Sequence, residues 1–413
     1  MSESKSPQSN KLSGGSSLSK NFMFLISNTG LSRLGTSAFS AIVLWVTLAL
    51  TNSPMLTGLV DGTTSLPLFL SFIVGSYIDQ SRKKRALAIS SSIIRPLSIA
   101  IAILALVSGN LFAIIASLFF TAFMIGFTSD VLNSIRSSWT KMILSEEEFK
   151  RGTSLLETSG SIAIAVGSGV SGVMLLFGFP EAFGLLILIF VAALLPVFFI
   201  KTKEDSQVQS SGERKSTKES MLEGLSFIRN TRPVVQMIVL TLFANFLFGT
   251  TGVILTALVQ KIFELPASYF GALFAVLSVA MIIGSLISSK VRGTVGRLAS
   301  ITFLVIGASL AAIAVSRSIY LDFALMFAIG LMIGIINVIA GTAFLKMVPG
   351  DMIARVMGSL NTFALGITFV SGAIGGTLIF LTSVTDALII VGALTCCIAL
   401  LSVTFRALNE LKV

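Results

Sequence analysis

Residues 75–87 read Gly-Ser-Tyr-Ile-Asp-Gln-Ser-Arg-Lys-Lys-Arg-Ala-Leu between two strongly apolar stretches. Consecutive cations stand out in this chain, because only 12% of its residues are charged and 54% are hydrophobic. A basic run of this kind anchors a loop at the anionic inner leaflet of a membrane. The segment therefore predicts a membrane protein and assigns this loop to the cytoplasmic side.

Outward from this loop, about twelve apolar stretches of near-membrane length follow one another along the chain. A bilayer core of roughly 30 Å needs about 20 helical residues for each crossing, and helices satisfy the backbone hydrogen bonds that lipid cannot supply. We therefore predict an all-α membrane protein. Its crossings are expected at residues 22–50, 55–78, 86–108, 111–135, 153–177, 182–200, 234–258, 267–289, 298–316, 320–344, 356–380 and 383–405.

The distribution of cations predicts how these crossings are threaded. All of the 29 Lys and Arg fall on one side of the predicted membrane, except Arg33, Arg95, Lys261 and Arg317. Positively charged segments stay on the cytoplasmic side, so we expect a plasma-membrane protein with both termini inside. The net charge of +10 follows from this topology. Basic residues scattered among short loops do not favour nucleic-acid binding.

Residues 201–231 divide the crossings into two sets of six. This segment is rich in Ser, Lys and Glu and includes an amphipathic stretch, Met221–Arg229, which indicates a cytoplasmic linker with a helix on the membrane surface. The predicted parts are a disordered cytoplasmic tail (1–20), a six-helix bundle (21–200), the linker (201–231), a second six-helix bundle (232–406) and a cytoplasmic tail (407–413).

The two halves of the chain repeat each other. The matched pairs are Lys141-Met142 with Lys346-Met347, Gly167 with Gly372, and Gly75-Ser76 with Gly284-Ser285. Since each half has six crossings, the repeats have the same orientation in the membrane. Parallel repeats place a substrate site at their interface and work by rocking against each other.

Several kinds of chemistry have no residues to support them. The chain contains no histidine, which removes the commonest metal ligand and the commonest proton shuttle. Cys396 and Cys397 are adjacent, a poor arrangement for a disulfide, and we interpret them as apolar filler. A nucleotide-binding Gly-x-x-x-x-Gly-Lys-Ser/Thr loop is also missing. We therefore expect no cofactor, no metal, no use of ATP and no enzymatic activity, and any proton carrier must be a carboxylate.

The loop at residues 75–87 resembles the signature loop of the major facilitator superfamily, in which a Gly, an Asp four residues on and a basic cluster recur. Gly75, Asp79, Arg82 and Lys83 match this pattern, whereas Gln80 stands where the family has an Arg. The resemblance implies the major facilitator fold, with two parallel, pseudo-symmetric six-helix bundles, in a monomeric transporter. It also implies that the four matching residues control gating.

Within that family, the chain resembles the macrolide-efflux and siderophore-export type. Arg95 lies inside crossing three as in that subgroup, although Ser92 replaces the acid that precedes it there. Residues 224–233 resemble the subgroup's entry to crossing seven. Residues 348–358 resemble its loop before crossing eleven, in which Arg355 is a further expected gating residue.

A glycine-rich stretch in crossing five resembles the antiporter signature of family exporters. Gly167, Gly169 and Gly172 carry the resemblance, while Ser168 replaces the usual proline. Small residues let helices pack closely in any membrane protein, so all three are expected at helix contacts. The resemblance adds that close packing there limits leakage between the halves.

Charges that fall inside the predicted crossings each need a partner or a function. The rise of a helix places Arg33 and Arg95 near mid-depth, about 15 Å from the inner face, and Glu157 about 9 Å from it. Asp130 is expected near the inner boundary and Asp61 near the outer one. The two deepest charges are therefore cations.

The family resemblance assigns roles to these groups. Crossings one, four, seven and ten line the cavity in the family, so Arg33 and Asp130 are expected to face it. Arg95 is expected to snorkel or to brace a neighbour, with Pro96 bending its helix. Glu157 is either a helix-start acid favoured by the dipole or a functional acid, and Asp61 is either a vestibule residue or a functional acid. Further cavity candidates are Asn28, Gln236, Asn245, Asn337 and Asn361.

These residues suggest a mechanism for export. Asp130, Glu157 or Asp61 takes up a proton when the site opens outward, and protonation weakens an ion pair with Arg33. Inward proton flow is thereby coupled to export of an amphipathic or lipophilic small molecule, for which abundant Phe and Met could form an adaptable cavity. Two alternatives remain open at this stage: an organic-anion or lysolipid transporter that uses Arg33, and a membrane scaffold that transports nothing.

Overall fold

The structure is a computed structural model that describes residues 19–70, 74, 78, 81, 83–201, 223, 226–349 and 353–411. All elements of the described residues are helical. Those of the first half are α1 (Lys20–Thr51), α2 (Pro54–Thr63) with the short η1 (Leu66–Leu70), α4 (Lys84–Ser108), α5 (Leu111–Ile143), α6 (Glu146–Met174) and α7 (Phe179–Phe199). Those of the second half are α9 (Arg232–Ala257), α10 (Ala267–Ile287), α11 (Val295–Val315), α12 (Ile319–Met347), α13 (Ile353–Leu381), α14 (Val384–Val403) and α15 (Arg406–Glu410).

Many helix ends coincide with residues that favour capping. Ser19 and Asn110 accept hydrogen bonds from the first turns of α1 and α5, and Ser145 forms a capping box with Glu148 at the start of α6. Gly109 follows α4 with a φ of +68°, a left-handed conformation that glycine adopts without strain. Short polar signals between apolar stretches thus set the lengths of the helices.

The predicted all-α membrane fold is confirmed. Among the described residues, ten helices are long and apolar enough to cross a membrane. The α2–η1 segment and α13 complete two sets of six. Two ranges differ most from the prediction. In the crossing expected at 55–78, α2 ends at Thr63 and the short η1 follows, and α5 continues past the expected end at residue 135 to Ile143. Of the predicted surface helix in the linker, residues 223 and 226–229 are helical and the rest lies outside the described residues.

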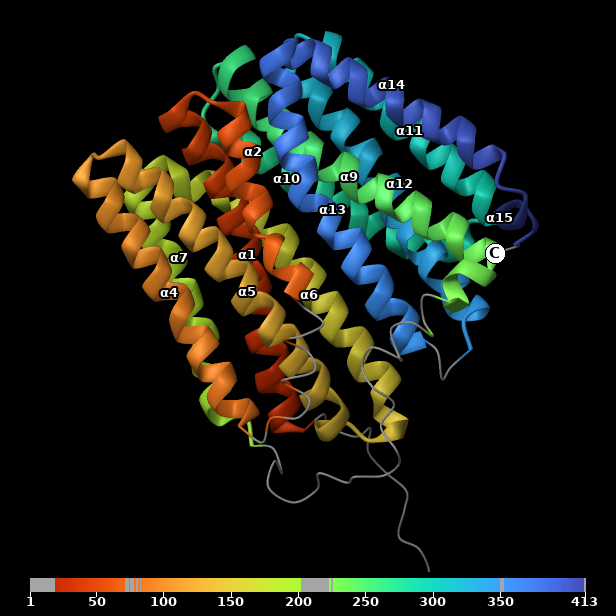
Figure 1. Cartoon of the computed structure of the whole chain (residues 1–413), viewed down its shortest axis with the longest axis horizontal. Coiled ribbons are helices and arrows are strands. Elements are labelled where there is room, and N and C mark those ends of the chain that lie inside the picture. Colours follow the sequence, from red (N-terminus) through yellow and green to blue (C-terminus); the bar gives the residue numbers. More distant parts are fainter. Residues whose placement is uncertain are drawn as a thin grey trace, which may run out of the picture.

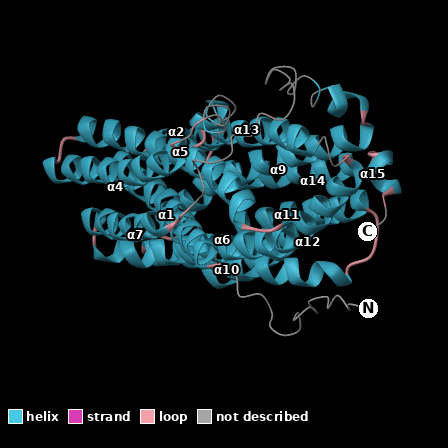
Figure 2. Cartoon of the chain, turned by 90° about the horizontal axis from the view of Figure 1, so that it is seen from below, coloured by secondary structure: helices cyan, strands magenta, loops and turns pink. Residues whose placement is uncertain are grey.

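The helices form two bundles, α1 to α7 and α9 to α14, which lie beside each other in Figure 2. The linker face is the face where α7 ends at Phe199 and α9 begins at Arg232. The opposite face contains the turn between α1 and α2, at Asn52 and Ser53. The seam is the boundary between the two bundles.

The bundles meet mainly near the opposite face, where α2 packs on α13 and α6 packs on α10. A Cβ built on Gly372 of α13 would lie 2.6 Å from the carbonyl oxygen of Gly58 on α2, and a Cβ on Gly172 of α6 would lie 3.1 Å from Gly271 Cα of α10. The rings of Trp45 and Phe270 also meet across the seam, 5.8 Å apart. In Figure 1 the linker-face ends of the first bundle point down and those of the second point to the right. The seam is therefore closed at the opposite face and widens toward the linker face.

The segment that follows α14 is packed against the second bundle. Leu408 of α15 is fully buried, and Val295 N at the start of α11 donates a 2.9 Å hydrogen bond to Leu411 O. These residues fall within the tail expected at 407–413, so much of that segment is attached to the helix bundle.

Candidate functional site

One ion pair connects α1 and α6 inside the first bundle. Arg33 Nη1 donates to Glu157 Oε2 at 2.9 Å and Nη2 donates to Oε1 at 3.1 Å, so the guanidinium binds both carboxylate oxygens. The side chains are 26% and 59% exposed. Gly160, one turn beyond Glu157, leaves the space that the Arg33 side chain occupies. Of the acids considered as partners of Arg33, the structure places Glu157 against it.

Arg95 is buried and braces four helices. Its side chain is 2% exposed and donates to Thr128 Oγ1 at 2.9 Å, to Ser129 Oγ at 2.7 Å and to Ser32 Oγ. Its guanidinium also lies 5.2 Å from the centroid of the Phe190 ring, a distance at which cation–π attraction operates. Arg95 of α4 is thus tied to α1, α5 and α7, which matches the expected bracing role and not the snorkelling alternative.

A second buried arginine was not anticipated. Arg136 was assigned to a loop, but α5 continues through it, and its Nε donates to Asn28 Oδ1 at 3.1 Å and its Nη1 to Asn133 Oδ1 at 3.2 Å. Asn28 was expected to line the cavity, yet it is 1% exposed and donates its amide to Ala193 O at 2.7 Å. Asn28 therefore supports Arg136 inside the bundle. The only signal in the sequence was the run of helix-compatible residues beyond position 135.

The remaining acids occupy different places. Asp130 is buried within α5. Asp61 lies on α2 between Gly58 and Gly62, the two glycines whose backbone approaches α13, and it is half-buried below the closed end of the seam. Asp322, which the sequence reasoning passed over, lies buried in the first turn of α12 and accepts a 2.6 Å hydrogen bond from Ser316 Oγ.

The glycines of crossing five lie at helix contacts. Gly167 packs against the backbone of Leu34 on α1, within the first bundle. Gly169 and Gly172 face α10 across the seam, where a Cβ on Gly169 would lie 2.8 Å from the Cβ of Ala275. One helix therefore carries both the Glu157 carboxylate and part of the contact that closes the opposite face.

The gating loop is described only in part. Gly75, Asp79 and Arg82 lie outside the described residues, as do the side chains of Arg355 and Asn361. Lys83 occupies the position before α4, and its backbone N donates to Ser81 Oγ at 3.2 Å.

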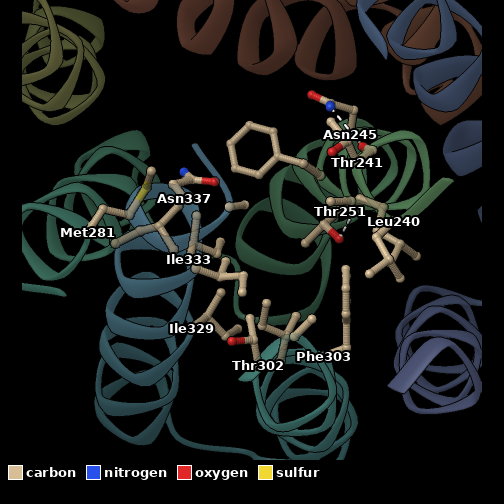
Figure 3. Close-up of a pocket in the computed structure, with 18 of the residues that line it drawn as sticks. Leu240, Thr241, Asn245, Thr251, Met281, Thr302, Phe303, Ile329, Ile333 and Asn337 are labelled. Carbon is tan, nitrogen blue, oxygen red and sulfur yellow. Dashed lines mark hydrogen bonds between the residues drawn. The ribbon is translucent and has the colours of Figure 1, made fainter. Parts of the chain in front are cut away.

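A cavity of about 360 Å³ lies within the second bundle. Its walls come from α9, α10, α11, α12 and α15, and none of the described residues that line it is charged. Two of the expected cavity residues, Asn245 and Asn337, are among them, whereas Gln236 is half-buried in the first turn of α9 outside it. In Figure 3 both asparagines lie on the side of the cavity nearest the brown ribbon of the first bundle, with Thr302, Phe303 and Ile329 on the far side.

The fold and these sites define a membrane transporter of two helix bundles. The sequence matches the Major Facilitator Superfamily over residues 25–373, and the chain belongs to this family. It is 25% identical over 365 residues to an uncharacterised MFS-type transporter, YkuC, of Bacillus subtilis (strain 168), an alignment that covers 83% of this chain and 82% of that protein.

Solved structures of transporters share the fold. The nucleoside transporter NupG superposes with a TM-score of 0.70 at 13% identity, covering 95% of this chain and 100% of that chain. A POT family transporter in complex with 5-aminolevulinic acid superposes with a TM-score of 0.72 at 12% identity, covering 95% and 97%. At these identities the likeness concerns the fold alone.

Proposed function

We propose that this chain is a proton-coupled exporter of amphipathic or lipophilic small molecules, of the macrolide-efflux type, in the plasma membrane with its linker face in the cytoplasm. The observation that carries the proposal is the uncharged cavity of about 360 Å³ in the second bundle. Ligand sites are largely apolar clefts with a few placed polar groups and volumes of roughly 300–1,000 Å³. This cavity fits that description for a substrate without a fixed charge.

The organic-anion alternative has less support. Arg33 is the cation it requires, and both ends of the Arg33 guanidinium are already bound by Glu157. A bidentate pair of this kind is among the stronger hydrogen-bonded contacts in proteins, so an anionic substrate would first have to displace the carboxylate. A lipophilic substrate in the second bundle leaves the pair intact.

The same pair supplies a route for proton coupling. A proton on Glu157 removes the charge that holds Arg33 and releases the guanidinium from α6. Because α6 also carries Gly169 and Gly172 at its contact with α10, a change in its position acts directly on the closed end of the seam. Uptake of the proton from one side of the membrane and its release to the other side would then favour opening of the seam at each face in turn.

Transport in proteoliposomes tests the proposal. Glu157→Gln, which resembles the protonated acid, should still move a lipophilic dye down its own gradient, and an imposed pH gradient should no longer stimulate that flux. Glu181→Gln, which changes an exposed acid of α7 away from the pair, is the matched control and should keep full stimulation. Stimulation that survives in both Glu157→Gln and Asp130→Asn would contradict the coupling, and the absence of any solute flux would favour a scaffold.

A further inference from the structure

The cavity of the second bundle is elongated, and buried residues line both of its ends. Along α11 its lining runs from Val295 to Leu310, a rise of about 22 Å. At the linker face the end is formed by Val295, Ala299 and Leu408, all buried. At the opposite face Leu255, Leu310 and Met326, also buried, form the other end.

The mouth of this cavity opens sideways, toward the seam. Phe248 on α9 is 52% exposed and lines the cavity, as do Asn245 and the exposed Asn337 on α12. Figure 3 places both amides on the side of the first bundle, and α9 itself contacts α1 and α2. A molecule in the seam can therefore insert an apolar part between these two asparagines.

The two amide side chains that line the cavity lie at its mouth, and the other polar groups of the lining are the hydroxyls of Thr241, Thr251 and Thr302. Asn245 Nδ2 donates to Thr241 O at 2.9 Å, and among the described residues its amide oxygen accepts no hydrogen bond, so this oxygen can accept one from a ligand. Inside, Thr241 Oγ1 donates to Met237 O at 2.9 Å and Thr251 Oγ1 to Leu247 O at 2.7 Å. Hydroxyls bonded to their own helix in this way require no polar partner from a ligand.

We propose that this cavity holds the unbranched alkyl chain of a single-chain amphiphile, whose uncharged polar head stays at the mouth with Asn245 and Asn337. The lining extends for about 22 Å along α11 and carries amide groups only at the mouth, an arrangement that matches an extended alkyl chain with a polar head at one end. The inference rests on the proposed function, since it names the substrate class of the proposed exporter.

Binding of a homologous series tests this inference. Alkyl glucosides with chains of six to twelve carbons, each below its micellar concentration, are titrated into the full-length protein in lipid nanodiscs, with empty discs as the blank. Burial of each added methylene should tighten binding about fourfold, the factor that corresponds to about 0.8 kcal/mol, until the cavity is full. Longer chains should then gain nothing.

Cavity-filling variants locate the chain. Ala299→Phe narrows the end near the linker face and Leu310→Trp the end near the opposite face. In at least one of these variants, affinity should stop rising at a shorter chain length than in the parent protein. The affinity for the six-carbon ligand should stay unchanged, which also shows that the variant is folded. Ala308→Phe, on the exposed side of α11 and outside the cavity, should leave the whole series unaltered.

Three outcomes would overturn the inference. In the first, the dependence of binding on chain length is the same for the protein as for empty discs. In the second, no cavity-filling variant changes the chain length at which affinity stops rising. In the third, a two-chain phospholipid copurifies with the protein and no alkyl ligand displaces it. If binding does not depend on chain length but dye flux is retained, this inference is wrong and the proposed function stands. Chain binding without any solute flux would instead remove the proposed function.

Discussion

Two arginines at similar predicted depth have different environments. Arg95 is enclosed by three hydroxyls and an aromatic ring, whereas Arg33 is partly exposed and bound to a carboxylate. Neutral partners hold a buried cation without any dependence on proton concentration. A carboxylate partner makes the second contact sensitive to protonation, and so Arg33 is the arginine suited to a coupling role.

The Arg95 network should matter for stability. Arg95→Lys keeps the charge, but an ammonium cannot reach the three hydroxyls with the geometry of a guanidinium. Unsatisfied buried polar groups cost about 1–3 kcal/mol each, so we expect a clearly lower midpoint of thermal unfolding in detergent. Arg297→Lys, at an exposed position of α11, should leave the midpoint unchanged. Equal midpoints for the two variants would show that the network contributes little.

Gly160 allows the Arg33–Glu157 pair to be disturbed without removing a charge. A Cβ at this position would lie 2.7 Å from Arg33 Cδ and 2.8 Å from Cζ, so Gly160→Ala should push the flexible arginine away from Glu157. A pair exposed to this extent contributes about 0–1 kcal/mol to stability, and we expect thermal unfolding to change little. Stimulation of dye flux by a pH gradient should fall severalfold.

Gly184→Ala on α7 is the control for this change, because a Cβ there meets no atom within 4 Å. Both variants also gain the same helix propensity. If a pH gradient stimulates dye flux fully in Gly160→Ala, the Arg33–Glu157 pair is not needed for proton coupling.

At the scale of helices, the internal repeat explains how the seam is closed. Gly167 of α6 matches Gly372 of α13, and residues 75–76 after α2 match residues 284–285 of α10. The contacts of α2 with α13 and of α6 with α10 are therefore equivalent under the repeat. Both depend on glycine, because the backbones approach closely enough to exclude a side chain.

A single methyl group in these contacts should change the preferred opening. In Gly58→Ala the new Cβ would meet the backbone of Gly372, which cannot rotate away as a side chain can. We expect α2 and α13 to separate at the opposite face, and spin labels at Ser53 and Thr382 should report longer distances in the variant. Gly341→Ala, where a Cβ meets nothing within 4 Å, should reproduce the parent distances. Unchanged distances in Gly58→Ala would mean that the contact tolerates a side chain.

At the scale of the whole molecule, the two bundles differ in chemistry although they share a fold. The first contains Arg33, Arg95, Arg136 and Glu157 between its helices, and the second surrounds an uncharged cavity. Under the proposed function, the first bundle responds to protons and the second accommodates an apolar ligand. Because the seam joins them, events in one bundle can alter access to the other.

The orientation that we propose from the distribution of cations can be tested directly. Single cysteines at Ser210 in the linker and at Ser318 between α11 and α12, in a chain with Cys396 and Cys397 replaced, are treated with a membrane-impermeant thiol reagent. The positive-inside distribution predicts that Ser318→Cys reacts in intact cells and Ser210→Cys only after permeabilisation. Labelling of Ser210→Cys in intact cells would reverse the orientation and make the open side external.

The sequence alone determined the class of fold, the approximate helix ranges and the repeat. These features depend on the length and polarity of local segments, because each crossing of the bilayer requires a sufficiently long apolar helix. The capping signals at Ser19, Asn110 and Ser145 coincide with observed helix starts for the same reason. The sequence also singled out Arg33, Glu157, Asn245 and Asn337, but gave no means to distinguish them from Asn28.

Only the tertiary structure decided which of these residues meet. Depth along a helix follows from residue number, but the direction of a side chain depends on how each helix is rotated against its neighbours. That rotation buries Asn28 beside Arg136, joins Arg33 to Glu157 and leaves Asn245 at the mouth of a cavity. The sequence likewise could not show at which face the bundles meet, because alternative conformations of one protein can differ by only a few kcal/mol.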